Sequence, residues 1–448
     1  MRCLIARGER RALATLLLLT TSLGSPQGLD GADRQEGRLL AGAASVEVTL
    51  PQGTPLGGYG GFPRRAWVPD VLGQHPHAFW FRPSTGVHDP LRVRSLTIES
   101  GQVRMLWLAV DLVGIDPALV SALRDRLGRE RLSYAAVIVS ASHTHSGPGA
   151  YGDSALFGFL AVDRLSPAVR ERIVDGLERA AREAETRKVP ARLAAARTEV
   201  RDIAQSRVRG PLDPELGVVK VTGADGRPVA LLWNYAIHGT ALGRENLLLS
   251  GDLMAEASLR LEREIGAPVL FVNGAVGDVS PRPRGWAGVK AAGEALAAGA
   301  RRAWAEARPE PSGLQVARES VALPSPSIAL RNCLGGWAPA WMTLDLGEAL
   351  PAAAEVIALR VGRTGWITIP GELETELGLQ IKAAARDRFS HVFIAGVSNA
   401  YLGYFLAPAD YRHPSYIACG SFYGERGGHI IRDAALAALR RVGPAVSR

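Results

Sequence analysis

Apolar runs of the strand type alternate along this chain with amphipathic patterns of the helical type. Apolar or alternating runs predict strands at 45–50, 92–98, 105–113, 135–139, 192–200, 217–222, 229–236 and 269–272. A period near 3.6 residues, with Glu and Arg on the outer face, predicts helices at 117–129 and 166–188. This alternation predicts an α/β fold, with mixed β-sheets flanked by helices in a single large domain.

Composition supports a globular protein with a substantial core. The 448 residues are 47% hydrophobic and 21% charged, and the formal net charge is +8. Four arginines and one glutamate precede Gly28, so 4 − 1 = +3 of that charge lies there. The rest is scattered without a block of like charge, and no nucleic-acid motif accompanies it. We therefore expect no nucleic-acid partner.

The N-terminus is typical of a targeting segment. Four early arginines precede the apolar run 12–24, which is too short to span a bilayer comfortably. We predict a signal peptide at 1–28, a polar leader at 29–40 and one domain at 41–448, in a secreted or periplasmic protein. A retained N-terminal anchor is the alternative. Cys333 and Cys419 could pair in an oxidising compartment, but their spacing does not decide this.

Histidines follow two of the predicted strands. His143 and His145 come after the apolar run 135–139, and His238 comes just after the run 229–236. In extended backbone, residues i and i+2 point to the same side, so we expect the first two rings to leave the strand together. Neutral imidazole is a common zinc ligand. The alternative is that these are structural histidines with satisfied hydrogen bonds.

Carboxylates and a serine occupy similar strand ends. Asp278 and Ser280 follow a buried strand in a glycine-relieved turn, Asp252 follows a Ser-Gly pair, and Glu372 follows Pro-Gly after another strand. Three histidines, a glutamate and tyrosines fit a zinc hydrolase better than a serine hydrolase, because the G-x-S-x-G elbow is missing. Asp252 and Asp278 are interpreted as residues that orient other groups or as turn residues, with the turn slightly favoured.

Five motifs occur together in an order that resembles the neutral/alkaline (non-lysosomal) ceramidase family. They are HTHSGPG (143–149), AIHGT (236–240), GDVSP (277–281), PGE (370–372) and SNAYLGY (398–404), followed by Tyr416. The resemblance spans roughly residues 41–440. It implies a Zn²⁺ ion held by four ligands, His143, His238, Glu372 and Tyr404.

The same resemblance implies roles for the other motif residues. His145 would face the polar head of the substrate, and Ser280 would be the nucleophile or would orient the reacting water. Tyr416 would donate a hydrogen bond to the developing oxyanion. Tyr404 and Tyr416 could instead be aromatic core residues, and Glu372 could be a charge favoured at a helix start.

The implied reaction is zinc-assisted hydrolysis of the N-acyl amide of ceramide to sphingosine and a fatty acid. Relatives of full length carry a second, immunoglobulin-like domain, which we do not expect here. The family's substrate-binding arginine lies in another context, and Arg207 is the nearest candidate. The alternatives are a hydrolase of other N-acyl amides or esters, and a non-catalytic lipid-binding relative. Expected partners are the lipid substrate and a membrane surface; the sequence does not indicate an oligomeric state.

Overall fold

The computed structural model describes residues 39–443. The predicted signal peptide lies outside the described residues, as does the predicted leader up to residue 38. Leu39 and Leu40 already belong to the first strand, which thus begins earlier than the alternating pattern indicates. Leu39, Ala41 and Ala43 are buried in the core.

A mixed nine-stranded sheet forms the base of the fold. Its strands are β1 (Leu39–Val48), β3 (Leu91–Ser100), β4 (Val103–Val110), β5 (Ala136–Ala141), β6 (Val189–Glu199), β8 (Glu215–Gly223), β9 (Pro228–Tyr235), β11 (Val269–Asn273) and β13 (Arg308–Glu310). The order is β11-β9-β8-β6-β1-β3-β4-β5, with β13 paired to β6. The β4–β5 and β9–β11 pairs are parallel and the others antiparallel. Two parallel pairs therefore lie at the two edges of the sheet.

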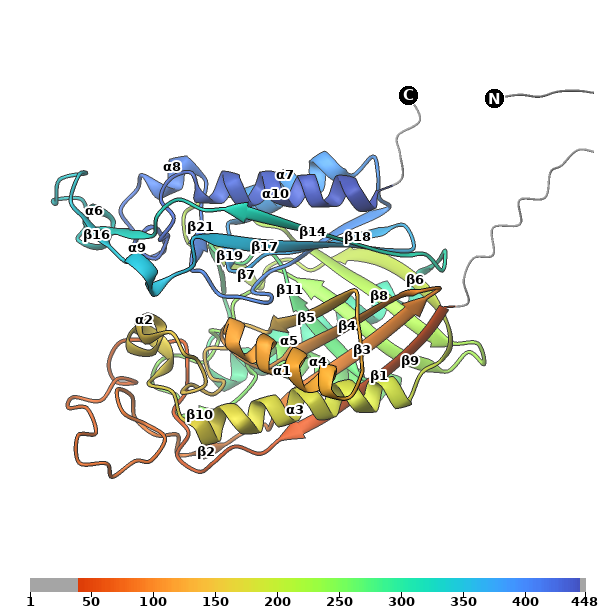
Figure 1. Ribbon diagram of the computed structural model, residues 1–448, viewed down its shortest axis with the longest axis horizontal. Helices are drawn as coiled ribbons and strands as arrows, with labels where there is room; N and C mark the ends of the chain where they lie inside the picture. The colour runs from red at the N-terminus through yellow and green to blue at the C-terminus, as the bar shows by residue number, and fades with distance from the viewer. Residues whose placement is uncertain (1–38, 444–448) are drawn as a thin grey trace, which may run out of the picture. The chain divides into compact units, whose positions relative to one another are not determined.

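Four helices cover the outer face of this sheet (Figure 1). They are α1 (Pro117–Arg129), α3 (Pro167–Thr186), α4 (Asp252–Ile265) and α5 (Gly285–Glu306). The first begins where the sequence predicts, because Asp116 accepts a hydrogen bond from the Ala118 amide and Pro117 takes the first helical position. Their apolar faces pack on the strands in two buried clusters.

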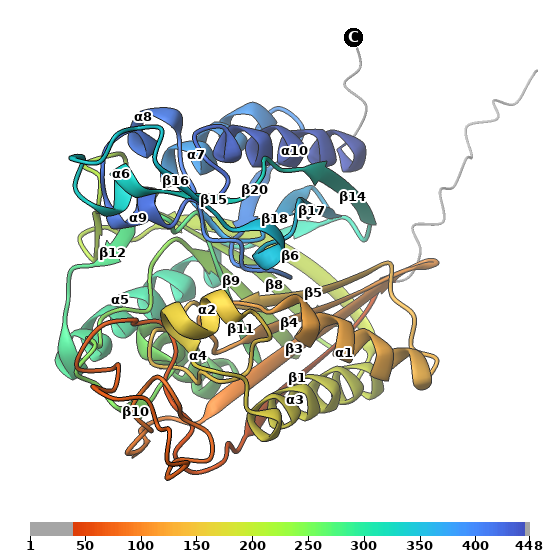
Figure 2. The same ribbon diagram turned by 60° about the vertical axis from the view of Figure 1, so that its left-hand side comes forward.

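A second sheet stacks on the inner face of the first. It contains β14 (Leu314–Ala322), β17 (Ala353–Val361), β18 (Thr364–Thr368) and β20 (His391–Ala395), in that order. Between the sheets, the rings of Trp107 and Trp366 lie 4.9 Å apart. The outer face of the second sheet is covered by α7 (Thr375–Ala385) and α10 (Gly427–Val442) (Figure 2). The result is an αββα layering, which confirms the predicted fold class.

Short elements connect these layers at one end. The short strand pairs are β2 (Gly86–Val87) with β10 (Leu248–Leu249), β7 (Ala204–Ser206) with β12 (Val279–Pro281), β15 (Ser327–Ala329) with β16 (Thr343–Asp345), and β19 (Glu372–Leu373) with β21 (Tyr404–Phe405). The short helices are α2 (Ala155–Phe157), a π-helical turn (Gly158–Val162), α6 (Leu330–Cys333), a 3₁₀ turn (Gly347–Ala349), α8 (Pro408–Tyr411) and α9 (Tyr416–Cys419). A disulfide between Cys333 and Cys419 joins α6 to α9, so these two cysteines do pair. Across the described range, no helix combines the length and apolar character needed to cross a bilayer.

Candidate metal centre and adjoining cavity

The two histidine-bearing strand ends meet because the edges of the large sheet approach each other. His143 follows β5, at one edge, and His238 follows β9, which lies next to the other edge. Thr144 and Gly239 form a parallel bridge between the two segments. Glu372 and Tyr404 are direct partners on the parallel strands β19 and β21. All four residues implied as zinc ligands therefore lie on backbone that converges on one region.

The side chains of this group lie within reach of a common centre. His143 Nε2 is 3.4 Å from Glu372 Oε1, and His238 Nε2 is 3.0 Å from Glu372 Oε2. The rings of His143 and His238 have centroids 4.4 Å apart. One nitrogen from each of His143, His145 and His238 can be chosen so that all three lie within 4.8 Å of one another. Three imidazoles and a carboxylate thus surround a small volume.

The ligand-type atoms of this centre are buried without satisfied hydrogen bonds. His143 Nε2, His238 Nε2 and Glu372 Oε2 find no hydrogen-bond partner among the described residues. Such groups are costly to bury. Burial lowers the pKa of His238 to about 3, which leaves a neutral ring with a free lone pair. Burial alone would raise the pKa of Glu372, but His143 and His238 hold it well below its ordinary value. Neutral imidazoles and an ionised carboxylate fit a divalent metal such as zinc.

The orientation of His143 is set by its own backbone. Its Nδ1 donates to the carbonyl of Val113, which leaves Nε2 directed at Glu372. His143 has φ +66°, a left-handed conformation that is uncommon outside glycine. The sequence pattern predicts that His143 and His145 share one side of an extended strand. This is wrong, because β5 ends at Ala141 and the two histidines lie in the turn that follows. The turn nevertheless keeps the two rings 5.0 Å apart.

Asn273, at the end of β11, ties the two histidine segments together. Its amide nitrogen donates to the carbonyls of Ser142 at 3.0 Å and Ile237 at 2.9 Å. Its side-chain oxygen accepts from the amide of Ile237 at 3.2 Å. One fully buried amide thus contacts the residues immediately before His143 and His238. The sequence signal was an asparagine closing an otherwise apolar strand, and its role depends on which strands are neighbours.

Tyr401 is a further residue that the motif reading did not single out. Its hydroxyl donates to Glu372 Oε1 at 2.6 Å, and its ring is inclined by 29° to that of His143, with centroids 6.2 Å apart. Glu372 itself lies in β19, whereas α7 begins at Thr375. The alternative that Glu372 is a charge at a helix start is therefore wrong. Tyr401 and β19 hold the carboxylate toward the histidines.

A cavity of about 450 Å³ opens beside this centre. His145, Glu372, Tyr401 and Tyr404 line one part of it. The apolar walls are formed mainly by Val113, Ile115, Phe157, Leu160, Val162, Leu350, Leu402 and Phe422. His145 is held by contacts behind it, since Arg64 donates to its carbonyl at 3.0 Å and the ring of Tyr59 packs edge-on at 4.9 Å. His145 lines the cavity, and its distance to the other histidines also permits metal contact.

Arg207, Ser280 and Tyr416 form a second polar group close to Tyr404. Ser280 lies in β12, paired to β7, and its hydroxyl accepts a 2.7 Å hydrogen bond from Arg207 Nε. The Arg207 guanidinium lies 5.5 Å from the ring centroid of Tyr416, and the rings of Tyr404 and Tyr416 are 6.3 Å apart. Tyr416 is 61% exposed, so the alternative that it is a core aromatic is wrong.

Asp278 and Asp252 accept hydrogen bonds from backbone amides at turns. Asp278 Oδ1 accepts from both the amide and the hydroxyl of Thr375, at 2.8 and 2.7 Å, and so fixes the start of α7 after Glu372. Asp252 has φ +58°, and its two oxygens accept from the amides of Leu242 and Leu253. The turn interpretation is therefore correct for both. Through Leu242, Asp252 also holds the loop that follows His238.

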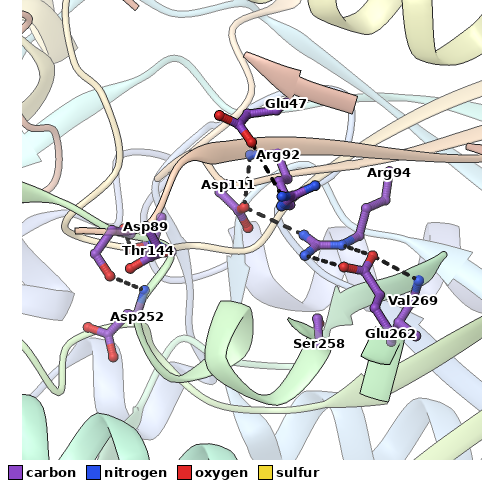
Figure 3. A network of polar contacts seen from close by, with 12 residues as sticks. Glu47, Asp89, Arg92, Arg94, Asp111, Thr144, Asp252, Ser258, Glu262 and Val269 are labelled. Atoms are coloured by element: carbon purple, nitrogen blue, oxygen red, sulfur yellow. Dashed lines mark hydrogen bonds and ion pairs between the residues drawn. The ribbon is translucent and has the colours of Figure 1, made fainter. Parts of the chain in front are cut away.

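A buried ion network supports the loop around Asp252 (Figure 3). Arg94 is almost completely buried between Asp111, at 3.6 Å, and Glu262, at 2.7 Å. Beside it, the Asp89 carboxylate accepts from the Gly251 amide at 2.7 Å, and Thr144 donates to the Ser250 carbonyl at 2.9 Å. Thr144 thus joins the segment that carries His143 and His145 to the loop that precedes Asp252.

Comparisons with known proteins agree with this arrangement. The family model described as neutral/alkaline non-lysosomal ceramidase, N-terminal, matches residues 78–298. Neutral ceramidase B of Dictyostelium discoideum is 25% identical over 232 residues, 45% of this chain and 32% of the relative. Neutral ceramidase of Mycobacterium tuberculosis is 26% identical over 206 residues, 41% of this chain and 32% of the relative. The match spans about a third of the length of these curated relatives.

The solved structures extend the likeness to most of the chain. The crystal structure of neutral ceramidase from Pseudomonas aeruginosa has a TM-score of 0.77 at 19% identity, covering 92% of this chain and 76% of that chain. At this identity the likeness concerns the fold. The fold and the buried ligand set define an α/β protein with a candidate metal centre. The family model and the curated relatives show that residues 78–298 are similar to the N-terminal part of neutral/alkaline ceramidases, in agreement with the motifs.

We expect Tyr401→Phe to weaken metal binding while the fold is kept. Removing the hydroxyl frees Glu372 Oε1 from its hydrogen bond and lets the carboxylate rotate, and loss of such an orienting partner lowers metal affinity about 10–100-fold. Zinc titration of metal-free protein measures this. Tyr151→Phe is the matched control, because the Tyr151 hydroxyl donates to the Gly114 carbonyl. Equal affinities for the wild type and Tyr401→Phe would contradict the assigned role.

We expect Asp252 to make the protein less stable as the pH rises. Burial raises its pKa to about 7, so the folded state keeps a proton that the unfolded chain loses near pH 4. The stability contributed by this group is complete below pH 4 and is lost as the pH approaches 7. Relative to the wild type, Asp252→Asn should gain about 2–3 kcal/mol between pH 5 and pH 8. Urea unfolding of both proteins measures the difference; a constant offset would refute it.

Proposed function

We propose that this protein is a zinc-dependent hydrolase that cleaves the N-acyl bond of ceramide, releasing sphingosine and a fatty acid. The observation that carries the proposal is the set of buried metal-ligating atoms of His143, His238 and Glu372 that lack hydrogen-bond partners, beside a mainly apolar cavity. An apolar cavity with a few converging polar groups suits a ligand with a hydrocarbon chain and one reactive polar bond. The names of the curated relatives support the same substrate.

Zinc would be held by His143, His238, Glu372 and Tyr404, and when bound it supplies a Lewis acid for the acyl oxygen and an acidified water. Around that ion, the remaining residues orient the amide and move its protons. The Tyr416 phenol keeps its proton at neutral pH and can donate to the oxyanion. Burial lowers the pKa of His145 well below its ordinary value, so a neutral ring with one N–H faces the cavity.

Ser280 is prepared for a role as nucleophile or as the group that orients the reacting water. Arg207 Nε occupies one lone pair of the Ser280 hydroxyl, which leaves its hydrogen free to point toward a second partner. The leaving amine must be protonated, and Tyr404, Tyr416 and His145 are the acids in reach of the cavity. Arg207 thereby positions the serine and, through its stacking on Tyr416, the phenol as well.

The protein is proposed to act outside the cytoplasm, as a secreted or periplasmic enzyme on lipid at a membrane surface. The Cys333–Cys419 disulfide supports this location, because structural disulfides persist mainly in oxidising compartments.

We expect ceramide hydrolysis to be lost on zinc removal and in His143→Ala. A chelator should abolish fatty-acid release from ceramide, added zinc should restore it, and the variant should bind zinc at least about tenfold more weakly while its circular dichroism is unchanged. Elemental analysis measures the metal independently of activity. The substrate panel contains ceramide, short N-acyl amides and an ester analogue. If another compound of the panel is hydrolysed faster than ceramide, that compound's class is the substrate instead of ceramide. Full activity without zinc would refute the proposal.

We expect Ser280→Ala to lower kcat by at least about 10²-fold with zinc content unchanged, because it removes a group that acts on the reacting bond or water. Ser206→Ala is the matched control on the partner strand, since Ser206 accepts hydrogen bonds from the Val208 and Gly210 amides. A kcat of Ser280→Ala within threefold of the wild-type value would show that Ser280 has no direct role in the reaction.

A further inference from the structure

Two loops expose large apolar side chains to an unusual degree. We call residues 59–72 and 334–344 the tryptophan loops. In the first, Trp67 is 85% exposed; in the second, Trp337 and Trp341 are 76% and 79% exposed. Exposed aliphatic residues accompany them: Val68, Val71, Leu72, Leu334 and Leu344. Single exposed apolar residues are ordinary, but clusters of this kind mark surfaces that contact a partner or a membrane.

The first tryptophan loop borders the cavity beside the candidate metal centre. Gly60 of this loop lines the cavity, and Arg65 donates to its carbonyl at 2.6 Å. The Arg65 guanidinium also stacks 4.7 Å from the ring centroid of Phe159. Phe159 is exposed, and the next residue, Leu160, both lines the cavity and reaches the surface. The apolar surface is therefore continuous with the cavity wall on this side.

The second tryptophan loop is tied to the opposite wall. It follows α6 and runs into β16, and the Cys333–Cys419 disulfide joins its base to α9. The chain after the loop leads to Ala349 and Leu350, which line the cavity, and Ala349 is exposed. The Ser327 amide donates to the carbonyl of Phe422, another lining residue. In both ribbon views, α6 and β16 and the loop before β2 lie at the same end of the fold (Figures 1 and 2).

The composition of the tryptophan loops favours a lipid bilayer as the partner of this surface. The second loop contains no charged residue, and the first contains only Arg64, Arg65 and Asp70. Arg64 is buried, and the Asp70 carboxylate accepts from the amides of Gln74 and His75. Tryptophan prefers the level of the lipid headgroups, where its ring is apolar and its N–H stays hydrated. A nearly uncharged aromatic surface suits a zwitterionic bilayer better than an anionic one.

We infer that the two tryptophan loops dock this protein on a zwitterionic membrane, with the cavity opening toward the bilayer between them. A lipid can then enter the cavity without its chains crossing water. A second copy on this surface would instead cover the opening. This inference rests on the proposed function only for what happens to the lipid after it enters the cavity. Docking itself requires no hydrolysis.

Vesicle binding tests this inference. The full chain is sedimented with phosphatidylcholine vesicles, and with vesicles that also contain phosphatidylserine, as wild type, Trp67→Ala, and Trp337→Ala combined with Trp341→Ala. We expect the double variant to bind about tenfold more weakly, because two indole rings lose their burial in the interface. Binding should change little with salt or added phosphatidylserine. Brominated acyl chains should quench wild-type tryptophan fluorescence more than that of the double variant.

The controls separate docking from catalysis. Val189→Ser, at an exposed apolar position of β6 outside both loops, should bind vesicles like the wild type. The double variant should keep its hydrolysis of a short, water-soluble N-acyl amide, and His143→Ala should still bind vesicles. Docking without ceramide hydrolysis by the wild type would leave the inference standing and refute the proposed function. Unchanged binding by the double variant, binding only to anionic vesicles, or a dimer that the substitutions dissociate would each overturn the inference.

Discussion

The arrangement of this site depends on the cost of burying unpaired polar atoms. Glu372, His143 and His238 are withdrawn from water, and their facing atoms do not satisfy one another with hydrogen bonds. A fold tolerates such a set only where the surrounding structure holds it firmly, or where a bound group supplies the missing partner. The shell around it is correspondingly dense, since Val113, Tyr401 and Asn273 each fix one ligand or its backbone.

Sheet topology explains how residues distant in sequence reach this point. The large sheet has parallel pairs at both edges, and the carboxyl ends of β5 and β9 carry His143 and His238. The second sheet lies across the first and delivers Glu372 and Tyr404 through the short parallel pair β19–β21. The Arg94 network and Asp252 brace the neighbouring loops. Each candidate ligand thus lies at or just beyond the end of a regular element, which gives the candidate centre a rigid frame.

Patterns in the sequence predicted many strands of the large sheet, two helices and the polar residues at strand ends, but not the long helices α4, α5, α7 and α10. Asp116 and Pro117 mark the start of α1, and apolar runs mark β5, β9 and β11. Strands of two or three residues, such as β19 and β21, have no detectable period. The roles of Asn273 and Tyr401, and the positive φ of His143, depend on which segments become neighbours. No local pattern contains that information.

The disulfide between α6 and α9 has a mechanical consequence. Cys419 closes the four-residue helix that begins with Tyr416, and Cys333 ends the helix that leads into the second tryptophan loop. A force on that loop is therefore transmitted covalently to the short helix that carries Tyr416, rather than being absorbed by a flexible connection. The second tryptophan loop and the helix that begins with Tyr416 are thus held together by one covalent bond, and reducing that bond would separate them.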